Sequence, residues 1–188
     1  MGSGKSTVAS FFAGMGAKTI DADGIGHELL SPGKACFRSV VRNFGKGILK
    51  NGKIDRAKLG AIVFKKRKAL AQLERIIHPA VRREILAQIR RNKKSVWVVD
   101  VPLLFEAGFD RFMDRTVVVT ANRDKQIDRA VKKLNITRAE ALQRIQRQMP
   151  QAQKIRRADF IIDNNGNISQ TKQQVKRIWQ KIQLKTKN

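Results

Sequence analysis

The spacing of apolar residues predicts a chain in which helices alternate with short buried strands. A first amphipathic helix follows from an apolar stripe at i, i+3, i+4 and i+7, namely Val8, Phe11, Phe12 and Met15. Apolar runs with the length of buried strands lie at 95–100, 116–120 and 158–164, and a shorter strand candidate lies at 17–20. This alternation indicates an α/β fold in which helices flank a parallel sheet.

Residues 24–94 have a helical pattern throughout, with turns at 31–33 and around 51–52. Two apolar stripes flank Pro79, and this proline suits the first turn of the second stripe. We therefore expect two helices that meet at Pro79. A last stripe at 175–182 predicts a closing helix.

The composition limits the number of domains and the class of protein that the chain can form. The chain has 188 residues, of which 41% are hydrophobic, so it is long enough for one folded domain. Its single cysteine, Cys36, cannot form an internal disulfide, and no apolar run reaches the length of a membrane span. We expect a soluble protein in a reducing, cytoplasmic compartment.

The charge balance is unusual, with 40 basic and 15 acidic side chains and a formal net charge of +25. Such a charge is typical of nucleic-acid-binding proteins, so a basic nucleic-acid-binding protein without enzyme activity is one alternative function. The basic residues are spread over most of the chain, however, and the signatures of helix-turn-helix, zinc-finger and RNA-recognition modules are absent. The basic charge then indicates either a surface adapted to anionic small substrates or a generally basic proteome. We expect a small-molecule partner, rather than a nucleic acid or a membrane.

The first seven residues carry the most informative motif. Gly4, Lys5 and Ser6 match the end of G-x-x-x-x-G-K-[ST], whereas the opening glycine of that motif would fall one residue before Met1. In such a phosphate loop the glycines let backbone N–H groups surround phosphate oxygens, the lysine reaches the outer phosphates, and the serine hydroxyl binds Mg²⁺. A flexible Gly/Ser-rich terminus and a signal peptide are alternatives, although the apolar stretch is short and lacks a cleavage site.

Three aspartates follow predicted strands, where α/β proteins place functional groups. Asp21 and Asp23 come after the first strand candidate, and either could instead be a turn or helix-cap residue. Asp100 closes the run at 95–100. In phosphate-loop enzymes an acidic residue at such a strand end assists Mg²⁺, so Asp100 is a metal candidate, with a solvated aspartate as the alternative.

Residues 123–157 hold 11 basic and three acidic side chains at helical spacing. A solvated helical face is the simple interpretation of such a charge run. The functional alternative is a mobile lid over phosphates, because charge that develops on a transferred phosphoryl group requires cations and the exclusion of water.

Taken together, the motifs resemble the dephospho-coenzyme A kinase family over essentially all 188 residues. The resemblance rests on residues 2–7, on Asp21-Ala22-Asp23 with His27, on His78-Pro79, on residues 102–106, on Gln148-Met149 and on residues 158–164. It implies transfer of the γ-phosphoryl group of ATP to the 3′-hydroxyl of dephospho-coenzyme A, with Mg²⁺, to give coenzyme A and ADP. It also implies a phosphate-loop kinase fold with five parallel strands, a helical acceptor-binding region at about 24–94 and a lid at about 123–157.

The same resemblance implies a role for each matching residue. The ATP phosphates would be bound by Gly2, Ser3, Gly4, Lys5, Ser6 and Thr7, and the acceptor pocket would contain His78, Pro102, Leu103 and Leu104. Asp23 would be the base that orients or deprotonates the 3′-hydroxyl, and Arg144 would face the phosphates from the lid. Lys133 stands where similar enzymes usually have an arginine, which keeps the charge but loses the bidentate fork. A nucleoside monophosphate kinase is the nearest alternative, and the motifs Asp-Ala-Asp and Pro-Leu-Leu-Phe-Glu argue against it.

The position of the phosphate loop also predicts that Met1 is an internal residue of a longer protein. A strand of about five or six residues and a short glycine turn would complete the motif. That strand would be central to the sheet, so its loss would deprive two strands of a neighbour and open a gap in the core. A form without it would then be poorly folded or nearly inactive.

Overall fold

The protein, described for residues 1–186 by a computed structural model, divides into two compact units. The first unit contains Met1–Ile20 and Ser95–Asn188, and the second contains Asp21–Lys94. None of the helices in the described part of the chain is both long and apolar enough to cross a membrane.

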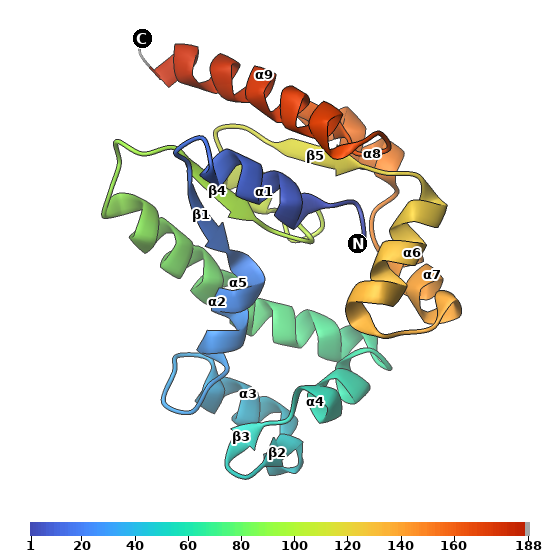
Figure 1. Ribbon diagram of the computed structural model, residues 1–188. Helices are drawn as coiled ribbons and strands as arrows, with labels where there is room; N and C mark the ends of the chain where they lie inside the picture. Colours follow the sequence, from blue (N-terminus) through green and yellow to red (C-terminus); the bar gives the residue numbers. More distant parts are fainter. Residues whose placement is uncertain (187–188) are drawn as a thin grey trace. The chain divides into compact units, whose positions relative to one another are not determined.

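The first unit consists of short strands covered by helices (Figure 1). In chain order its elements are α1 (Lys5–Ala13), β1 (Lys18–Asp21), β4 (Trp97–Asp100), the 3-10 helix η2 (Phe109–Phe112), β5 (Val117–Thr120), α6 (Arg123–Leu134), α7 (Arg138–Gln146), α8 (Gln151–Arg157), β6 (Phe160–Asp163) and α9 (Ile168–Thr186). The strands predicted near 17–20, 95–100, 116–120 and 158–164 are all confirmed, as are the first and last helices.

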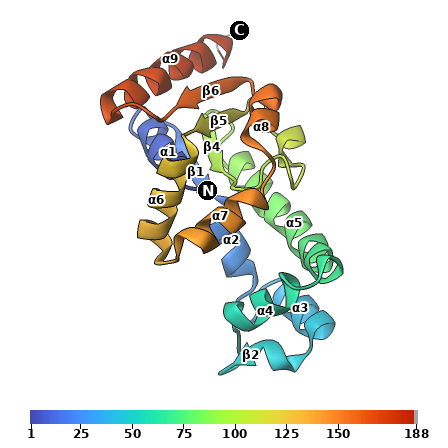
Figure 2. The same cartoon turned by 90° about the vertical axis from the view of Figure 1, so that its right-hand side faces the viewer.

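These strands form two pairs. β1 pairs with β4, and β5 pairs with β6 in parallel, from Val117 opposite Phe160 to Thr120 opposite Asp163. Figure 2 shows β4, β5 and β6 in the same region of the unit, yet β4 and β5 belong to different sheets among the described residues. The single five-stranded sheet that the resemblance implies is therefore not formed, because the described chain has no strand that bonds to both β4 and β5.

One apolar cluster joins the two strand pairs to helices α1 and α9. Phe12 from α1 and Trp179 from α9 are 2% and 8% exposed, and their ring centroids lie 6.2 Å apart. Burial of a side chain such as Phe12 stabilises the fold by roughly 1.5–3 kcal/mol. The apolar stripes that predict these two helices are thus the faces that hold the unit together.

β4 differs from its prediction in one respect. Its apolar sequence predicts a buried strand, but each of its four residues is only half-buried. A strand inside a parallel sheet is shielded by neighbours on both edges, and β4 has only β1 beside it among the described strands. β5, by contrast, has three buried residues out of four.

The second unit is helical except for one hairpin. Its elements are α2 (Ala22–Leu29), α3 (Phe37–Phe44), the 3-10 helix η1 (Lys46–Ile48), β2 (Leu49–Lys50), β3 (Lys53–Ile54), α4 (Arg56–Val63) and α5 (Arg67–Arg90). The fully helical pattern predicted for 24–94 is wrong at the hairpin, where Leu49 pairs with Ile54. Asn51 and Gly52 turn the chain with φ of +51° and +73°, and Asn-Gly favours this two-residue turn.

The predicted helix boundary at Pro79 is also wrong, because α5 runs without interruption from Arg67 to Arg90. A proline inside a helix removes a backbone hydrogen bond and costs about 3 kcal/mol. Ala80, Val81 and Ile85 are buried on the same helix, which packs against α2, α3 and α4. This packing offsets the cost of the proline, since tertiary contacts contribute most of the stability of a helix in a folded protein.

Candidate functional site

At two positions of the phosphate loop the backbone has a left-handed conformation that favours glycine. Gly2 and Gly4 have φ of +69° and +95°. A Cβ atom on Gly2 would lie 2.1 Å from the carbonyl oxygen of Gln126, and one on Gly4 would lie 2.1 Å from Nδ2 of Asn164. Both distances are far shorter than any van der Waals contact, so the loop needs these two glycines for conformation and for space.

Asn164, directly after β6, holds this loop in place. Its side-chain Nδ2 donates to the carbonyl oxygen of Ser3 over 2.7 Å, and its Oδ1 accepts from the Thr171 hydroxyl over 2.9 Å. Asn164 and Thr171 are 8% and 0% exposed. Because both hydrogen bonds are buried, the conformation of the loop depends on the β6–α9 connection.

The start of α1 is suited to an anion. Gly4 precedes the helix without a side-chain cap, and the first turn has no acidic residue. The first N–H groups of a helix have no partner within it, and the helix dipole attracts negative charge there. Lys5 adds a cation at the same end. The geometry therefore fits the phosphates of a nucleotide.

Arg129 from α6 supplies a further cation at this loop. Its Nη2 donates to the carbonyl oxygen of Asn164 over 3.3 Å, and its Nη1 is buried without a hydrogen-bond partner. Nη1 would lie 3.9 Å from a Cβ atom on Gly4. Arg129 cannot be identified from the sequence, because the pattern does not distinguish it from the other ten basic residues of 123–157.

A cavity of about 600 Å³ adjoins the phosphate loop. Its lining comes from the loop, from the segment after β4, from β5, from the N-terminal part of α6, from the end of α7 and the segment after it, and from α8. It includes Ser3, Lys5, Pro102, Leu104, Phe105, Val118, Gln126, Gln146 and Gln148. The structure thus brings the predicted residues Pro102 and Leu104 together with Lys5. Leu103 is not part of this lining and is 39% exposed.

Asp100 ends β4 with a carboxylate that could hold a metal. Its Oδ1 is buried and has no hydrogen-bond partner. An oxygen of this kind fits Mg²⁺ or a water molecule bound to it, and Ser6 offers a hydroxyl in the first turn of α1. Residues 1–186 contain no group of three His, Cys, Asp or Glu side chains placed to bind a metal.

The second unit contains three of the predicted site residues, namely Asp21, Asp23 and His78. Asp21 caps α2, since its Oδ1 accepts the Asp23 backbone N–H over 3.0 Å, so the helix-cap interpretation holds for Asp21. The Asp23 side chain is exposed in the first turn of α2. His78 is half-buried on α5, and burial lowers its pKa against the opposing effect of Glu74. At neutral pH His78 is therefore an uncharged hydrogen-bonding group.

Helices α6 and α7 form a hairpin. An ion pair between Arg138 and Asp128 joins them, and Thr137 and Glu140 form a capping box at the start of α7. Arg144 is exposed in the last turn of α7 and is not part of the cavity lining, although Ile145 and Gln146 are. Lys133 is exposed in the last turn of α6.

Glu106 fixes the segment after α7 to the segment after β4. Its Oε1 accepts the Met149 backbone N–H over 2.9 Å and pairs with Nζ of Lys154 on α8 at 2.7 Å. The side chains of Glu106 and Lys154 are only 21% and 16% exposed. Burial raises the pKa of Glu106, but the hydrogen bonds from Lys154 and Met149 lower it further, so the net shift is downward.

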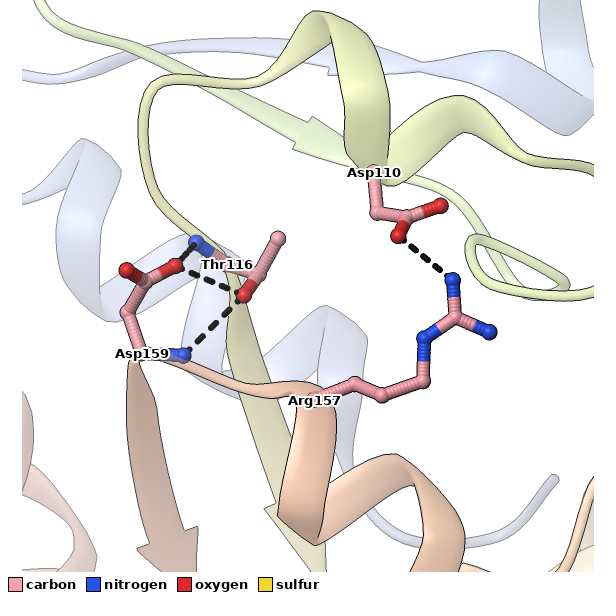
Figure 3. A network of polar contacts seen from close by, with 4 residues as sticks. All are labelled: Asp110, Thr116, Arg157 and Asp159. Atoms are coloured by element: carbon pink, nitrogen blue, oxygen red, sulfur yellow. Dashed lines mark hydrogen bonds and ion pairs between the residues drawn. The ribbon is translucent and has the colours of Figure 1, made fainter.

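A second ion pair holds the end of α8. Arg157 pairs with Asp110 at 2.6 Å (Figure 3). The Arg157 guanidinium also lies 4.8 Å from the ring centroid of Phe105. Beside it, the Thr116 N–H and hydroxyl donate to Asp159 over 2.7 and 2.8 Å, which ties the start of β5 to the segment before β6. Within residues 123–157, α8 is thus anchored to the strand layer, whereas α7 contacts chiefly α6.

Comparisons with known proteins agree with this geometry. The sequence profile of a family described as dephospho-CoA kinase matches residues 1–170. A dephospho-CoA kinase of Geobacillus kaustophilus is 43% identical over 178 residues, which cover 92% of this chain and 88% of that protein. A solved dephospho-CoA kinase from Campylobacter jejuni superposes with a TM-score of 0.68 at 30% identity, over 95% of this chain and 91% of that one. A crystal structure of a Thermus thermophilus protein gives a TM-score of 0.85 at 28% identity, over 96% and 93% of the two chains. The chain, in which a phosphate loop with glycines at positions 2 and 4 leads into α1, belongs to the dephospho-CoA kinase family.

Proposed function

We propose that this protein transfers the γ-phosphoryl group of ATP to the 3′-hydroxyl of dephospho-coenzyme A and releases coenzyme A and ADP. The observation that carries the proposal is the geometry of the phosphate loop. It has two glycines with left-handed φ, a following helix whose first turn has no side-chain cap, and a lysine at the start of that helix. These features suit a nucleotide phosphate. Membership of the family supports the choice of acceptor.

On the donor side, residues 2–7 would hold the ATP phosphates through backbone N–H groups, with Lys5 as the cation for the outer phosphates. Ser6 and Asp100 would hold Mg²⁺, and the buried Oδ1 of Asp100 is available for this role. When bound, Mg²⁺ neutralises charge on the phosphates and orients them. Arg129 would add a second protein cation, because its Nη1 is buried beside the loop without a partner.

On the acceptor side, Asp23 would orient the 3′-hydroxyl and accept its proton as the bond to phosphorus forms. The cap formed by Asp21 fixes the first turn of α2 and so restricts the position of Asp23. His78, neutral at physiological pH, would bind the acceptor by a hydrogen bond without adding charge. Pro102, Leu103 and Leu104 would provide apolar contacts.

Negative charge moves toward the bridging and outer oxygens as the phosphoryl group is transferred. Fixed cations therefore stabilise the transition state more than they stabilise the bound substrates. Arg144 at the end of α7 would supply such a charge when the hairpin of α6 and α7 covers the substrates. Catalysis would then rest on positioning and charge neutralisation, as in other phosphoryl transfers.

The experiment that tests this function measures ADP release by the full-length protein with ATP, Mg²⁺ and one acceptor at a time. Dephospho-coenzyme A should support turnover, whereas coenzyme A should not, because its 3′-position already carries a phosphate. Preferential turnover of AMP or another nucleoside monophosphate would favour the alternative kinase. A rise in melting temperature with RNA or DNA, and none with ATP or dephospho-coenzyme A, would replace the enzyme by a nucleic-acid binder.

A further inference from the structure

Helix α9 runs beside β6 (Figure 2), and one of its side chains bonds to the backbone at the end of this strand. Oε1 of Gln174 accepts the backbone N–H of Asp163 over 2.9 Å, and Nε2 of Gln174 donates to the carbonyl oxygen of Asp163 over 2.8 Å. One amide thus bonds both backbone polar groups of the last residue of β6. The opposite residue of an antiparallel strand would bond them in the same way, so the Gln174 amide takes the place of such a strand.

The edge of β6 that Gln174 covers has no neighbouring strand. Among the described strands β6 pairs only with β5, and Asn164 continues this pairing by donating its N–H to the carbonyl oxygen of Thr120. Neighbouring residues of a strand direct their backbone groups to opposite edges, so those of Asp163 point away from β5. Gln174 therefore fixes the end of β6 on the side that the sheet leaves open.

The residue that follows Asp163 is in contact with the phosphate loop. Nδ2 of Asn164 donates to the carbonyl oxygen of Ser3 over 2.7 Å, and a Cβ atom on Gly4 would lie 2.1 Å from the same nitrogen. Asn164 is thus packed against two residues of the loop. A shift of the end of β6 must consequently either move the loop or break the hydrogen bond to Ser3.

The same face of α9 holds the Asn164 side chain. Thr171 lies three residues before Gln174, so the two side chains are neighbours on the helix, and the Thr171 hydroxyl donates to Oδ1 of Asn164 over 2.9 Å. Val175 and Trp179 of α9 are 0% and 8% exposed and pack in the core of the first unit, so the helix is itself held in place. Helix α9 therefore fixes Asn164 through its side chain and through the backbone of the preceding residue.

We infer that Gln174 is a positioning residue for ATP binding. It holds the end of β6, so that Asn164 keeps Ser3 and Gly4 in the conformation that receives the nucleotide phosphates. Gln174 is not among the described residues that line the cavity beside the loop, so it acts through Asn164 and not by contact with the nucleotide. The inference rests on ATP binding in the proposed function and adds to it a residue of the closing helix.

Gln174→Met tests this role, because methionine has nearly the length and volume of glutamine but cannot replace the two hydrogen bonds to Asp163. The dissociation constant of ATP, measured by calorimetry with Mg²⁺, should rise by about three- to tenfold. At saturating ATP, kcat should stay within about twofold, because Gln174 touches neither substrate. Gln173→Met is the matched control, since its exposed side chain makes no hydrogen bond among the described residues, and it should leave the dissociation constant unchanged.

A double-mutant cycle shows whether the effect passes through Asn164. In the Asn164→Ala background, Gln174→Met should weaken ATP binding no further, because the residue that it positions is already gone. A general loss of stability would instead weaken binding equally in both backgrounds. Gln174→Glu keeps the acceptor for the Asp163 N–H and loses the donor, so its ATP affinity should lie between those of the parent protein and Gln174→Met.

The inference is overturned if Gln174→Met binds ATP as tightly as Gln173→Met, or if its effect is undiminished in the Asn164→Ala background. Either result would leave the proposed function intact, provided that the parent protein phosphorylates dephospho-coenzyme A. A parent protein that binds ATP but does not transfer phosphate to this acceptor would contradict the proposed function, whereas the affinities of the variants would still decide the role of Gln174.

Discussion

The side-chain amide of Asn164 donates to the carbonyl oxygen of Ser3 over 2.7 Å, across 161 positions of the chain. This buried hydrogen bond connects the end of the last strand to the loop that would hold ATP. A Cβ atom on Gly4 would lie only 2.1 Å from the same amide nitrogen, so Asn164 both supports the loop and prevents a larger residue at Gly4. Donor binding and the stability of the first unit should consequently depend on one another.

Replacement of Asn164 by alanine should weaken both properties. Ser3 would lose its buried partner, and a lost buried hydrogen bond costs about 1–3 kcal/mol. We expect lower stability in urea unfolding and roughly tenfold weaker ATP binding by calorimetry. Asn165→Ala is the matched control, because its half-buried side chain bonds Asp163 and Asn122 rather than the loop. Equal ATP affinity in the two variants would remove Asn164 from this role.

A comparison of Gly4→Ala with Gly16→Ala distinguishes the effect of backbone strain from that of a steric clash of the new methyl group. Both glycines have left-handed φ, +95° and +102°, so alanine at either costs about 1–2 kcal/mol of backbone strain. Only at Gly4 would the new methyl group meet another atom, whereas nothing lies within 4 Å at Gly16. Gly4→Ala should therefore abolish ATP binding, and Gly16→Ala should lower stability while leaving ATP affinity intact. Similar ATP affinities would contradict the close fit of the loop.

The Glu106–Lys154 pair predicts a specific dependence of stability on pH. The pKa of Glu106 lies below its ordinary value of 4.5, so its ionised form stabilises the fold above that pH, and this stabilisation is lost as the pH falls through the lowered pKa. Glu106→Gln should reduce the free energy of unfolding by about 2 kcal/mol at pH 7, and the difference from the parent protein should vanish once the pH has fallen below the lowered pKa of Glu106.

Glu28→Gln is the control for this measurement. Glu28 also pairs with a lysine at 2.7 Å, but its side chain and that of Lys34 are 66% and 50% exposed. Exposed pairs contribute little, so urea unfolding at pH 7 should show a much smaller effect for Glu28→Gln. If Glu28→Gln lowers the free energy of unfolding as much as Glu106→Gln does, burial of the Glu106–Lys154 pair adds nothing to stability.

The sequence predicts the first unit well because its signals are local and strong. The stripe of Val8 and Phe12 defines α1, and continuous apolar runs define β5 and β6. In the second unit the pattern fails where a local signal competes with packing. Pro79 favours a helix boundary, but the buried face of α5 continues through it. The turn predicted around Asn51-Gly52 is present, but it joins two short strands that the helical pattern of 24–94 does not indicate.

The candidate site was only partly predictable for a different reason. The role of Gly4 follows from a motif of fixed spacing, so it can be found along the chain. The contributions of Arg129 and Asn164 depend on contacts between residues far apart in sequence, and neither stands out among its neighbours. The anchoring of α8 by Glu106 was likewise missed, although a carboxylate in an apolar segment is a signal for a buried partner.

Arg144→Ala tests the cation assigned to the hairpin of α6 and α7. Its charge is needed chiefly while the phosphoryl group is transferred, so kcat should fall by about 10- to 100-fold with a smaller change in the KM for dephospho-coenzyme A. Arg138→Ala is a control on the same helix, where an ion pair with Asp128 gives the side chain a structural role. If kcat is retained and only acceptor affinity falls, Arg144 contacts the acceptor instead.

The most direct test of the proposed chemistry is the rate of phosphoryl transfer from ATP to dephospho-coenzyme A in the Asp23→Asn variant of the full-length protein. Asparagine keeps the shape of Asp23 but cannot accept the proton, so kcat should fall by about 100-fold or more with little change in ATP affinity. Asp21→Asn should retain most of the rate, because asparagine also caps helices and Asp21 serves as the cap of α2. A near-normal rate in Asp23→Asn would contradict the assignment of Asp23 as the base.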